Sequence, residues 1–204
     1  MKKFFVILLL FCGCSAMAQA QDIRRLFIEA PDSVLPLLDS GSRADCVDFA
    51  DAGMVYPVTN RFSGKCVMKE LSDSYLLLQT SGASTFEMML LPCNGGFVTC
   101  VVNTVFAEAA DSRIAFFDSD WKRLDTARFF TAPAIADFFT DLSTAGKQAE
   151  KCDMYLVALK RGDADNTIVA EYTMPDYMTP DDAAAIRPLL RKITYTWNGV
   201  RFNE

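Results

Sequence analysis

Residues 65–117 read KCVMKELSDSYLLLQTSGASTFEMMLLPCNGGFVTCVVNTVFAEAADSRIAFF, and this stretch decides the fold. Short apolar runs rich in Val, Phe, Tyr and Thr alternate here with clusters of Ser, Asp, Gly and Asn, which is typical of strands joined by tight turns. The spacing predicts four or five antiparallel strands that follow one another as a meander. The apolar runs are Val67–Leu71, Tyr75–Gln79, Thr85–Leu91, Phe97–Phe106 and Ile114–Phe117.

Toward the N-terminus the pattern predicts two short helices. Asp22 is expected to cap a helix whose apolar side chains recur at i, i+3 and i+4. Ser42 is expected to cap a second helix that runs to about Ala52, with Gly53 just beyond its end. Three acids spaced three apart on the second helix are interpreted as a solvated stripe rather than a metal-facing row: Asp45, Asp48 and Asp51.

Beyond the meander the chain continues with further strands and two amphipathic helices. Trp121–Leu124 is predicted to return as a strand. Thr131 is expected to cap a helix that presents apolar side chains at i, i+3, i+4 and i+7. Another hairpin is predicted from Met154–Lys160 and Thr167–Met174. The apolar positions of the first helix are Ile135, Phe138, Phe139 and Leu142.

Thr179 and Pro180 open the last predicted helix, with Thr179 as its cap. The final strand, Ile193–Trp197, alternates apolar and polar residues, and Asn198-Gly199 predicts a two-residue hairpin turn after it. The whole order predicts an α+β fold. We expect an antiparallel β-meander sheet with N-terminal helices and two further amphipathic helices packed on it, as one domain over residues 21–204.

Residues 1–20 have the pattern of a targeting signal. Lys2 and Lys3 precede an apolar segment too short to span a bilayer, and Ala-x-Ala sites follow it. We expect cleavage before Gln19 or Gln21 and a periplasmic or secreted protein. The alternative is an outer-membrane lipoprotein, because the residues before Cys14 loosely resemble a lipobox. The membrane is a partner only if Cys14 is lipidated.

Composition excludes several kinds of chemistry. The chain has no histidine, so His-dependent triads and His-containing metal sites are excluded. Its formal net charge is −6 without a basic run, which argues against nucleic-acid binding. Residues 163–166 resemble the start of a calcium loop, but Ile168 and Met174 replace the required glycine and acid, so a hairpin turn is favoured. We expect no metal, cofactor or catalytic residue.

Five cysteines follow the leader, an odd number that leaves at least one thiol unpaired. Cys93 and Cys100 flank the Gly95-Gly96 turn and are candidates for a cross-strand disulfide. The alternative for all five is a role as small buried hydrophobic residues.

Several short motifs together resemble a family of secreted Bacteroidales proteins of unknown function. They are residues 31–38 (PDSVLPLL), 43–49 (RADCVDF), 58–60 with Gly64, 74–76, 89–92 (MLLP), 114–118 with Trp121, and 197–199 (WNG). The resemblance covers most of the chain after the leader. It implies export and a single domain, and it brings no activity. Cys46 stands where the family usually has an apolar Met, which implies a core position.

Two sites, Asp32-Ser33-Val34 and Asp125-Thr126-Ala127, resemble the O-glycosylation acceptor of exported Bacteroidales proteins. Ser33 and Thr126 are therefore candidate glycosylation sites. The alternative is structural, with Asp32 or Ser33 as a helix cap and Thr126 in a loop.

Two classes of function remain open. The first is a non-catalytic binding or structural module for a protein, peptide or glycan partner, with the ligand itself undetermined. The second is a periplasmic hydrolase that acts on glycans with carboxylates alone, which needs two acids about 5 to 10 Å apart in a cleft. No pair of acids in the sequence stands out for that role, so the first class is favoured.

Overall fold

The protein has an α+β fold with two antiparallel sheets, seen in a computed structural model that describes residues 22–204. The larger sheet has seven strands that neighbour one another in sequence order, so the predicted meander is confirmed. Its strands are β1 (Val58–Thr59), β2 (Lys65–Leu71), β3 (Tyr75–Ser81), β4 (Ser84–Cys93), β5 (Gly96–Phe106), β6 (Ala110–Phe117) and β7 (Arg123–Leu124).

The second sheet has four strands in the order β11-β10-β9-β8. The predicted hairpin is present as β8 (Val157–Arg161) and β9 (Thr167–Tyr172), and β10 (Ile193–Trp197) shows the expected alternation of buried and exposed residues. β11 (Phe202–Asn203) closes the sheet.

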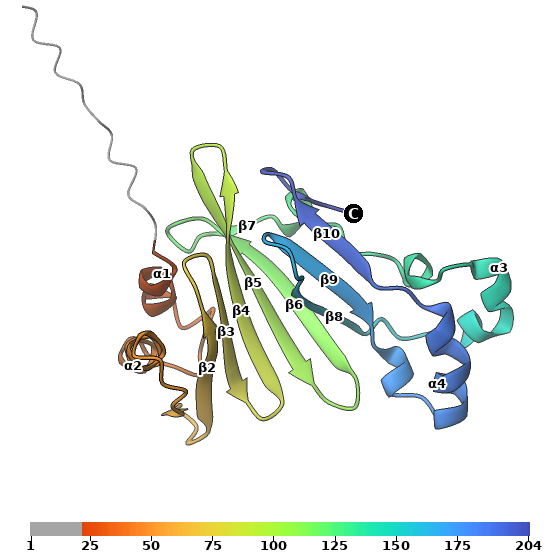
Figure 1. The fold of residues 1–204 in the computed structure, drawn as a ribbon, viewed down its shortest axis with the longest axis horizontal. Coiled ribbons are helices and arrows are strands. Elements are labelled where there is room, and N and C mark those ends of the chain that lie inside the picture. The colour runs from red at the N-terminus through yellow and green to blue at the C-terminus, as the bar shows by residue number, and fades with distance from the viewer. Residues whose placement is uncertain (1–21) are drawn as a thin grey trace, which may run out of the picture.

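Helices lie at both ends of the molecule, with the large sheet between them (Figure 1). The N-terminal pair is α1 (Ile23–Glu29) and α2 (Ser40–Asp51). Beyond the second sheet lie α3 (Leu142–Ala145) and α4 (Pro180–Ile186). The 3-10 turns are η1 (Thr126–Arg128), η2 (Ile135–Phe138), η3 (Gly146–Lys151), η4 (Met174–Asp176) and η5 (Arg187–Leu189). No helix within residues 22–204 is long and apolar enough to cross a membrane.

The two faces of the large sheet bury two different cores, because successive side chains of a strand point to opposite faces. Leu76 and Leu78 of β3 pack with α1 and α2, in a cluster that includes Leu26 and Phe27. On the other face, Tyr75 of β3 belongs to the cluster that the second sheet completes. The large sheet is therefore covered by helices on one face and by the second sheet on the other.

Backbone donors of the edge strand β8 are bonded by side chains of the large sheet. Val157 N donates to Asp111 Oδ1 at 3.4 Å, and Leu159 N donates to Ser112 Oγ at 2.8 Å. Arg161 N donates to Glu87 Oε2 at 3.2 Å. These hydrogen bonds give partners to backbone N–H groups on the edge of the second sheet, and they hold this sheet against the first.

The segment that we predicted as one helix after Thr131 is divided in the structure. Ile135–Phe138 forms the short turn η2, Phe139 is extended and pairs with Leu190, and Leu142 begins the separate helix α3. Thr140 N donates to Leu189 O, and Arg191 N donates to Phe138 O. These long-range backbone hydrogen bonds replace the helical ones. Tertiary pairing therefore prevents the continuous helix that the apolar periodicity predicted.

Three predicted ends of elements can be compared with the structure. Asp22 caps α1 as expected, accepting from Arg24 N at 2.9 Å. The prediction that Ser42 caps α2 was wrong. The helix begins at Ser40 and its cap is Asp39, whose Oδ1 accepts from Ser42 N at 2.8 Å. Gly53 follows α2 with a φ of +71°, the left-handed conformation that glycine adopts without strain.

The turn between β10 and β11 is longer than predicted. Trp197 pairs with Phe202, so the loop has the four residues 198–201 instead of two. Asn198 Oδ1 accepts from both Val200 N and Arg201 N at 2.9 Å, and this side chain stabilises the longer loop.

The candidate disulfide between Cys93 and Cys100 is not formed, and both thiols are free. In the β4–β5 ladder Cys93 faces Gly96, whereas Cys100 faces Met89. The two cysteines are thus about 13 Å apart along the ladder, beyond the Cα separation of about 7 Å that a disulfide tolerates. Cys46 is 1% exposed, as expected of a core residue, and burial raises its pKa to about 12.

Candidate functional site

A hollow of about 390 Å³ lies where the large sheet meets the β8–β9 turn, and we call it the polar hollow. Strands β2, β3 and β4 supply one wall, and the end of β8 with the turn after it supplies the other. Its volume lies in the range of about 300 to 1,000 Å³ that is usual for small-molecule sites. The lining residues are Glu70, Tyr75, Leu77, Glu87, Lys160, Arg161, Gly162 and Asp163.

Glu87 is the most unusual residue of the polar hollow, because it is an acidic residue with only 5% exposure. Its Oε2 accepts from the Tyr75 hydroxyl at 2.8 Å and from Arg161 N at 3.2 Å. Burial raises the pKa of Glu87, and these two hydrogen bonds act in the opposite direction. Burial, together with the neighbouring carboxylate, also raises the pKa of Tyr75.

Arg161 is held in place by three contacts around the same hollow. Its guanidinium donates to Glu70 Oε1 at 2.6 Å and to Asp165 Oδ1 at 3.3 Å. It also lies 4.6 Å from the centre of the Tyr75 ring, in a cation–π contact. The charge of Arg161 is therefore already engaged by groups of the protein.

A second hollow, of about 490 Å³, is mostly apolar, and we call it the apolar hollow. It lies between the β5–β6 turn and the segments before β8 and α4, and it is lined by Ala107, Glu108, Ala109, Met154, Leu156 and Tyr177. Tyr177 is 56% exposed, and Phe106 and Tyr155, which adjoin the lining residues in sequence, are 45% and 46% exposed.

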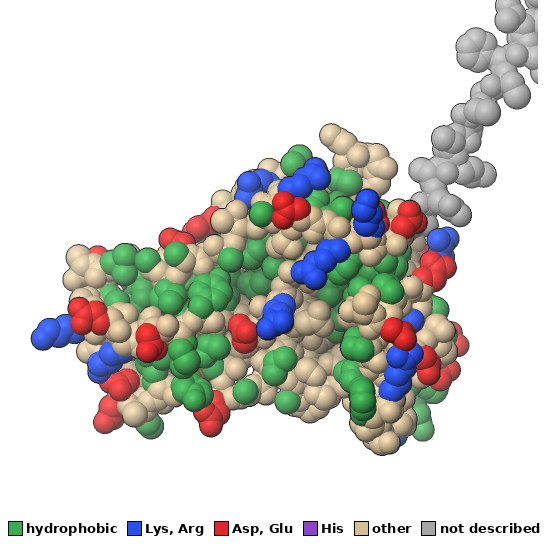
Figure 2. Space-filling model, turned by 180° about the vertical axis from the view of Figure 1, so that it is seen from behind, with side chains coloured by type: hydrophobic (Ala, Val, Ile, Leu, Met, Phe, Trp, Pro, Cys, Tyr) green, Lys and Arg blue, Asp and Glu red, His purple; other side chains and the backbone are tan. Residues whose placement is uncertain are grey.

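Charged side chains of both signs lie on the face that Figure 2 shows, several of them next to one another. Apolar side chains reach the surface there, with acidic and basic ones interspersed between them. This face therefore presents no extended area of one charge sign.

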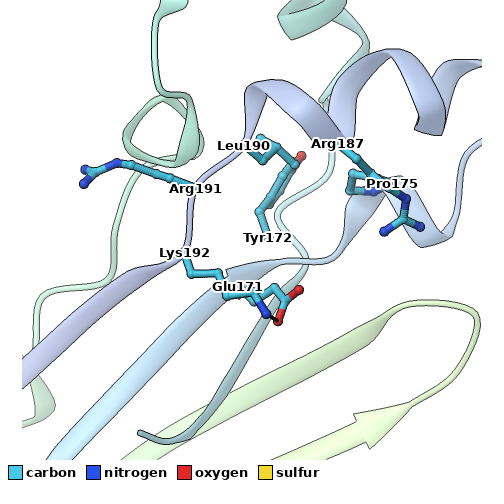
Figure 3. A pocket seen from close by; sticks show the side chains of 7 residues that line it. All are labelled: Glu171, Tyr172, Pro175, Arg187, Leu190, Arg191 and Lys192. Carbon is cyan, nitrogen blue, oxygen red and sulfur yellow. Dashed lines mark ion pairs between the residues drawn. The ribbon is translucent and has the colours of Figure 1, made fainter. Parts of the chain in front are cut away.

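A third and smaller hollow, of about 160 Å³, lies beside η5 and the start of β10 (Figure 3). Each of its three cationic side chains is paired. Lys192 contacts Glu171 at 2.8 Å, Arg187 contacts Asp176 at 2.5 Å, and Arg191 contacts Glu204 at 2.6 Å. Its small volume and its paired charges make it the weakest of the three as a binding site.

The candidate modification sites lie away from these hollows. Ser33 is exposed in a turn, and the preceding Asp32 is paired with Arg61 at 2.7 Å. Thr126 is half-buried at the start of η1, whose cap is Asp125. Glycosylation of Ser33 and Thr126 stays a prediction. Cys14 and the signal lie outside the described residues.

The predicted acidic stripe of α2 is exposed to solvent at Asp45, Asp48 and Asp51. Asp51 is paired with Arg24 at 2.9 Å. Within residues 22–204 no group of three or more Cys, Asp or Glu side chains is placed to hold a metal ion.

The sequence interpretation missed Glu87 and Arg161 as site residues. The available signal was the composition of β4, in which Glu87 is the one charged residue among apolar neighbours. An acidic residue in such a run is either exposed to solvent or buried with a hydrogen-bond partner. The spacing of the apolar residues does not distinguish these two cases. Arg161 carried no comparable signal, because charged residues are common beside turns.

The fold defines a two-sheet α+β protein whose meander sheet is covered by helices on one face. This architecture does not by itself indicate an activity. Residues 15–202 match the family model described as Protein of unknown function (DUF3256), and the chain belongs to this family. The predicted resemblance to a family of unknown function is confirmed to that extent.

A solved structure has the same architecture. It is described as the structure of a domain of an uncharacterized protein from Porphyromonas gingivalis W83, a member of the Bacteroidales. The two chains are 25% identical with a TM-score of 0.76, and the match covers 89% of this chain and 98% of the other. No curated protein matches this chain.

Proposed function

We propose that this protein is an exported, non-catalytic binding module that holds a protein or peptide partner in the apolar hollow. The observation that supports the proposal is an open, apolar hollow of about 490 Å³ that is lined by the exposed aromatic side chain of Tyr177. Tyr177 is an anchor of the kind that interfaces favour, because a tyrosine buries a large apolar area at a low entropic cost.

Export rests on the pattern of residues 1–20. Under this proposal the protein acts in the periplasm or outside the cell, and the lipoprotein alternative places it on the outer membrane through Cys14. The intact mass of the protein from its native envelope distinguishes the two. An N-terminus at Gln19 or Gln21 supports cleavage, whereas a diacylglycerol adduct on Cys14 overturns it.

The alternative function, a carboxylate-dependent glycan hydrolase, has one observation in its favour. Glu70 and Glu87 line the same polar hollow, and the pKa of Glu87 is raised as a general acid requires. Against it, Glu70 is bound by the Arg161 guanidinium, and Glu87 Oε2 is occupied by two donors. Neither the family description nor the description of the related structure names an activity.

Site-specific photocrosslinking in living cells tests the binding module. A benzophenone amino acid is placed at Tyr177, and in a matched variant at Phe62, which is 76% exposed and does not line the hollow. We expect a discrete crosslinked band from position 177 that is absent from position 62. The added substitution Met154→Asp should remove this band. An equal set of bands from both positions would contradict the proposal.

A further inference from the structure

The polar hollow is lined by a carboxyl oxygen to which no described residue donates a hydrogen bond. Oε2 of Glu87 is occupied, but no donor within residues 22–204 bonds its Oε1. Glu87 as a residue is 5% exposed, and it lines the hollow. Among residues 22–204 this oxygen is not one of the fully buried polar atoms without a hydrogen bond, so it is open to the hollow, where a donor of a ligand can reach it.

The rim of the hollow offers a donor, Lys160, whose charge acts on Glu87, and a second acceptor, Asp163. Lys160 and Asp163 are exposed, and neither side chain has a hydrogen bond or an ion pair with another of the described residues. A hydroxyl group donates one hydrogen bond and accepts two. A ligand with several hydroxyl groups therefore fits Glu87 Oε1, Asp163 and Lys160 together.

Charged ligands fit this hollow poorly. An anion would meet three carboxyl groups, those of Glu70, Glu87 and Asp163. A cation would meet Lys160 and Arg161, and Arg161 already covers the face of the Tyr75 ring on which a cation would stack.

The walls of the hollow are already organised for binding. Arg161 is fixed by Glu70, Asp165 and the Tyr75 ring, so its position does not have to be ordered by a ligand. Leu77 adds an apolar lining on which the carbon face of a ring can pack.

We propose that the polar hollow binds a neutral, hydroxyl-rich ligand, namely a saccharide unit, through Glu87 Oε1, Asp163 and Lys160. This site is separate from the apolar hollow, and the proposal does not depend on the protein-binding function.

Calorimetric titration of the full mature protein with neutral trisaccharides tests the proposal. The probes are maltotriose, cellotriose, chitotriose and xylotriose, with citrate and spermidine as anionic and cationic comparisons. We expect saturable binding of at least one trisaccharide and none of citrate or spermidine. Binding of citrate or spermidine alone, or of no probe, would overturn the assignment.

The substitution Glu87→Gln tests the contribution of one atom, Glu87 Oε1, to ligand binding. The amide oxygen keeps the bonds from Tyr75 and Arg161 N, while its NH2 group replaces the free acceptor. We expect trisaccharide binding to weaken roughly tenfold to hundredfold, the equivalent of one hydrogen bond to a charged group. The matched variant Glu150→Gln, at an exposed residue that lines none of the three hollows, should bind the trisaccharide as the wild type does.

A second variant, Lys160→Met, tests the same site if the Glu87→Gln variant does not fold. Lys160 is exposed at the rim of the hollow, so its substitution should not disturb folding. Weaker binding by this variant supports the site, and unchanged binding overturns it. Chromatography of the trisaccharide after incubation separates binding from hydrolysis. Intact sugar supports the assignment, whereas shortened sugar overturns it in favour of the hydrolase.

Discussion

The two tryptophans of the chain provide an internal comparison of how much one hydrogen bond between the sheets contributes to stability. Trp197, at the end of β10, donates from Nε1 to the Pro92 carbonyl of β4 at 2.6 Å. Trp121 also has a buried Nε1, but it has no hydrogen-bond partner among the described residues. Replacing each tryptophan by phenylalanine removes a bonded indole N–H in one case and an unbonded one in the other.

The expected costs follow from these contacts. Trp197 is 7% exposed and packs against Phe202, with ring centres 5.3 Å apart. The smaller ring of Trp197→Phe costs roughly 1 kcal/mol of buried area, and the lost hydrogen bond costs about 1 to 2 kcal/mol because the Pro92 carbonyl loses its donor. Trp121→Phe loses part of its contact with Phe117 but removes an unsatisfied donor, so we expect a cost below about 1 kcal/mol.

Urea unfolding followed by far-ultraviolet circular dichroism measures both variants without using tryptophan fluorescence, which each substitution changes. We expect Trp197→Phe to lower the free energy of unfolding by about 2 to 3 kcal/mol, or the midpoint of thermal unfolding by roughly 4 to 12 °C. Equal losses in the two variants would refute the reasoning, since the hydrogen bond to Pro92 would then contribute nothing to the docking of the sheets.

Three further predictions concern individual side chains. Because burial raises the pKa of Glu87, the native state binds this proton more tightly than the unfolded chain, and stability falls as pH rises through the folded pKa. Glu87→Gln should flatten that part of the pH profile, measured as urea midpoints from about pH 4 to pH 8, and a profile parallel to the wild type would contradict this. Thr179→Ala should cost about 1 kcal/mol, since Thr179 caps α4, and Thr179→Ser should retain most of the stability in the same urea assay. Gly64→Ala should cost about 1 to 3 kcal/mol, because its Cβ would lie 2.9 Å from Nδ2 of Asn60, whose amide is held by several bonds. A thermal midpoint equal to that of the wild type would show that Asn60 moves aside freely.

The strands were the part of the fold that sequence reasoning predicted best. β4 and β5 were expected as Thr85–Leu91 and Phe97–Phe106 and are observed as Ser84–Cys93 and Gly96–Phe106. Their apolar runs end in Gly, Asn and Ser, and those local preferences agree with the long-range pairing. Asp22 and Thr179 were recognised as caps for the same reason, because a cap depends on backbone groups a few residues away.

The helix predicted through Phe138 and Phe139 failed for the opposite reason. Its apolar period was real, and both side chains are buried. The backbone of Phe139 nevertheless pairs with Leu190, about fifty positions away in the chain. No local pattern reveals a competing partner at that distance, and tertiary pairing overrides a weak helical propensity.

The polar hollow shows the same division between sequence and structure. The sequence by itself determined the antiparallel meander, the absence of histidine chemistry and the burial of most cysteines, because each depends on composition or on neighbours in the chain. Only the tertiary structure decided that Glu87 meets Tyr75 and Arg161, which come from three different strands. The physical reason is that the environment of a side chain, and so its charge state and its free hydrogen-bonding atoms, depends on which strands pack against it.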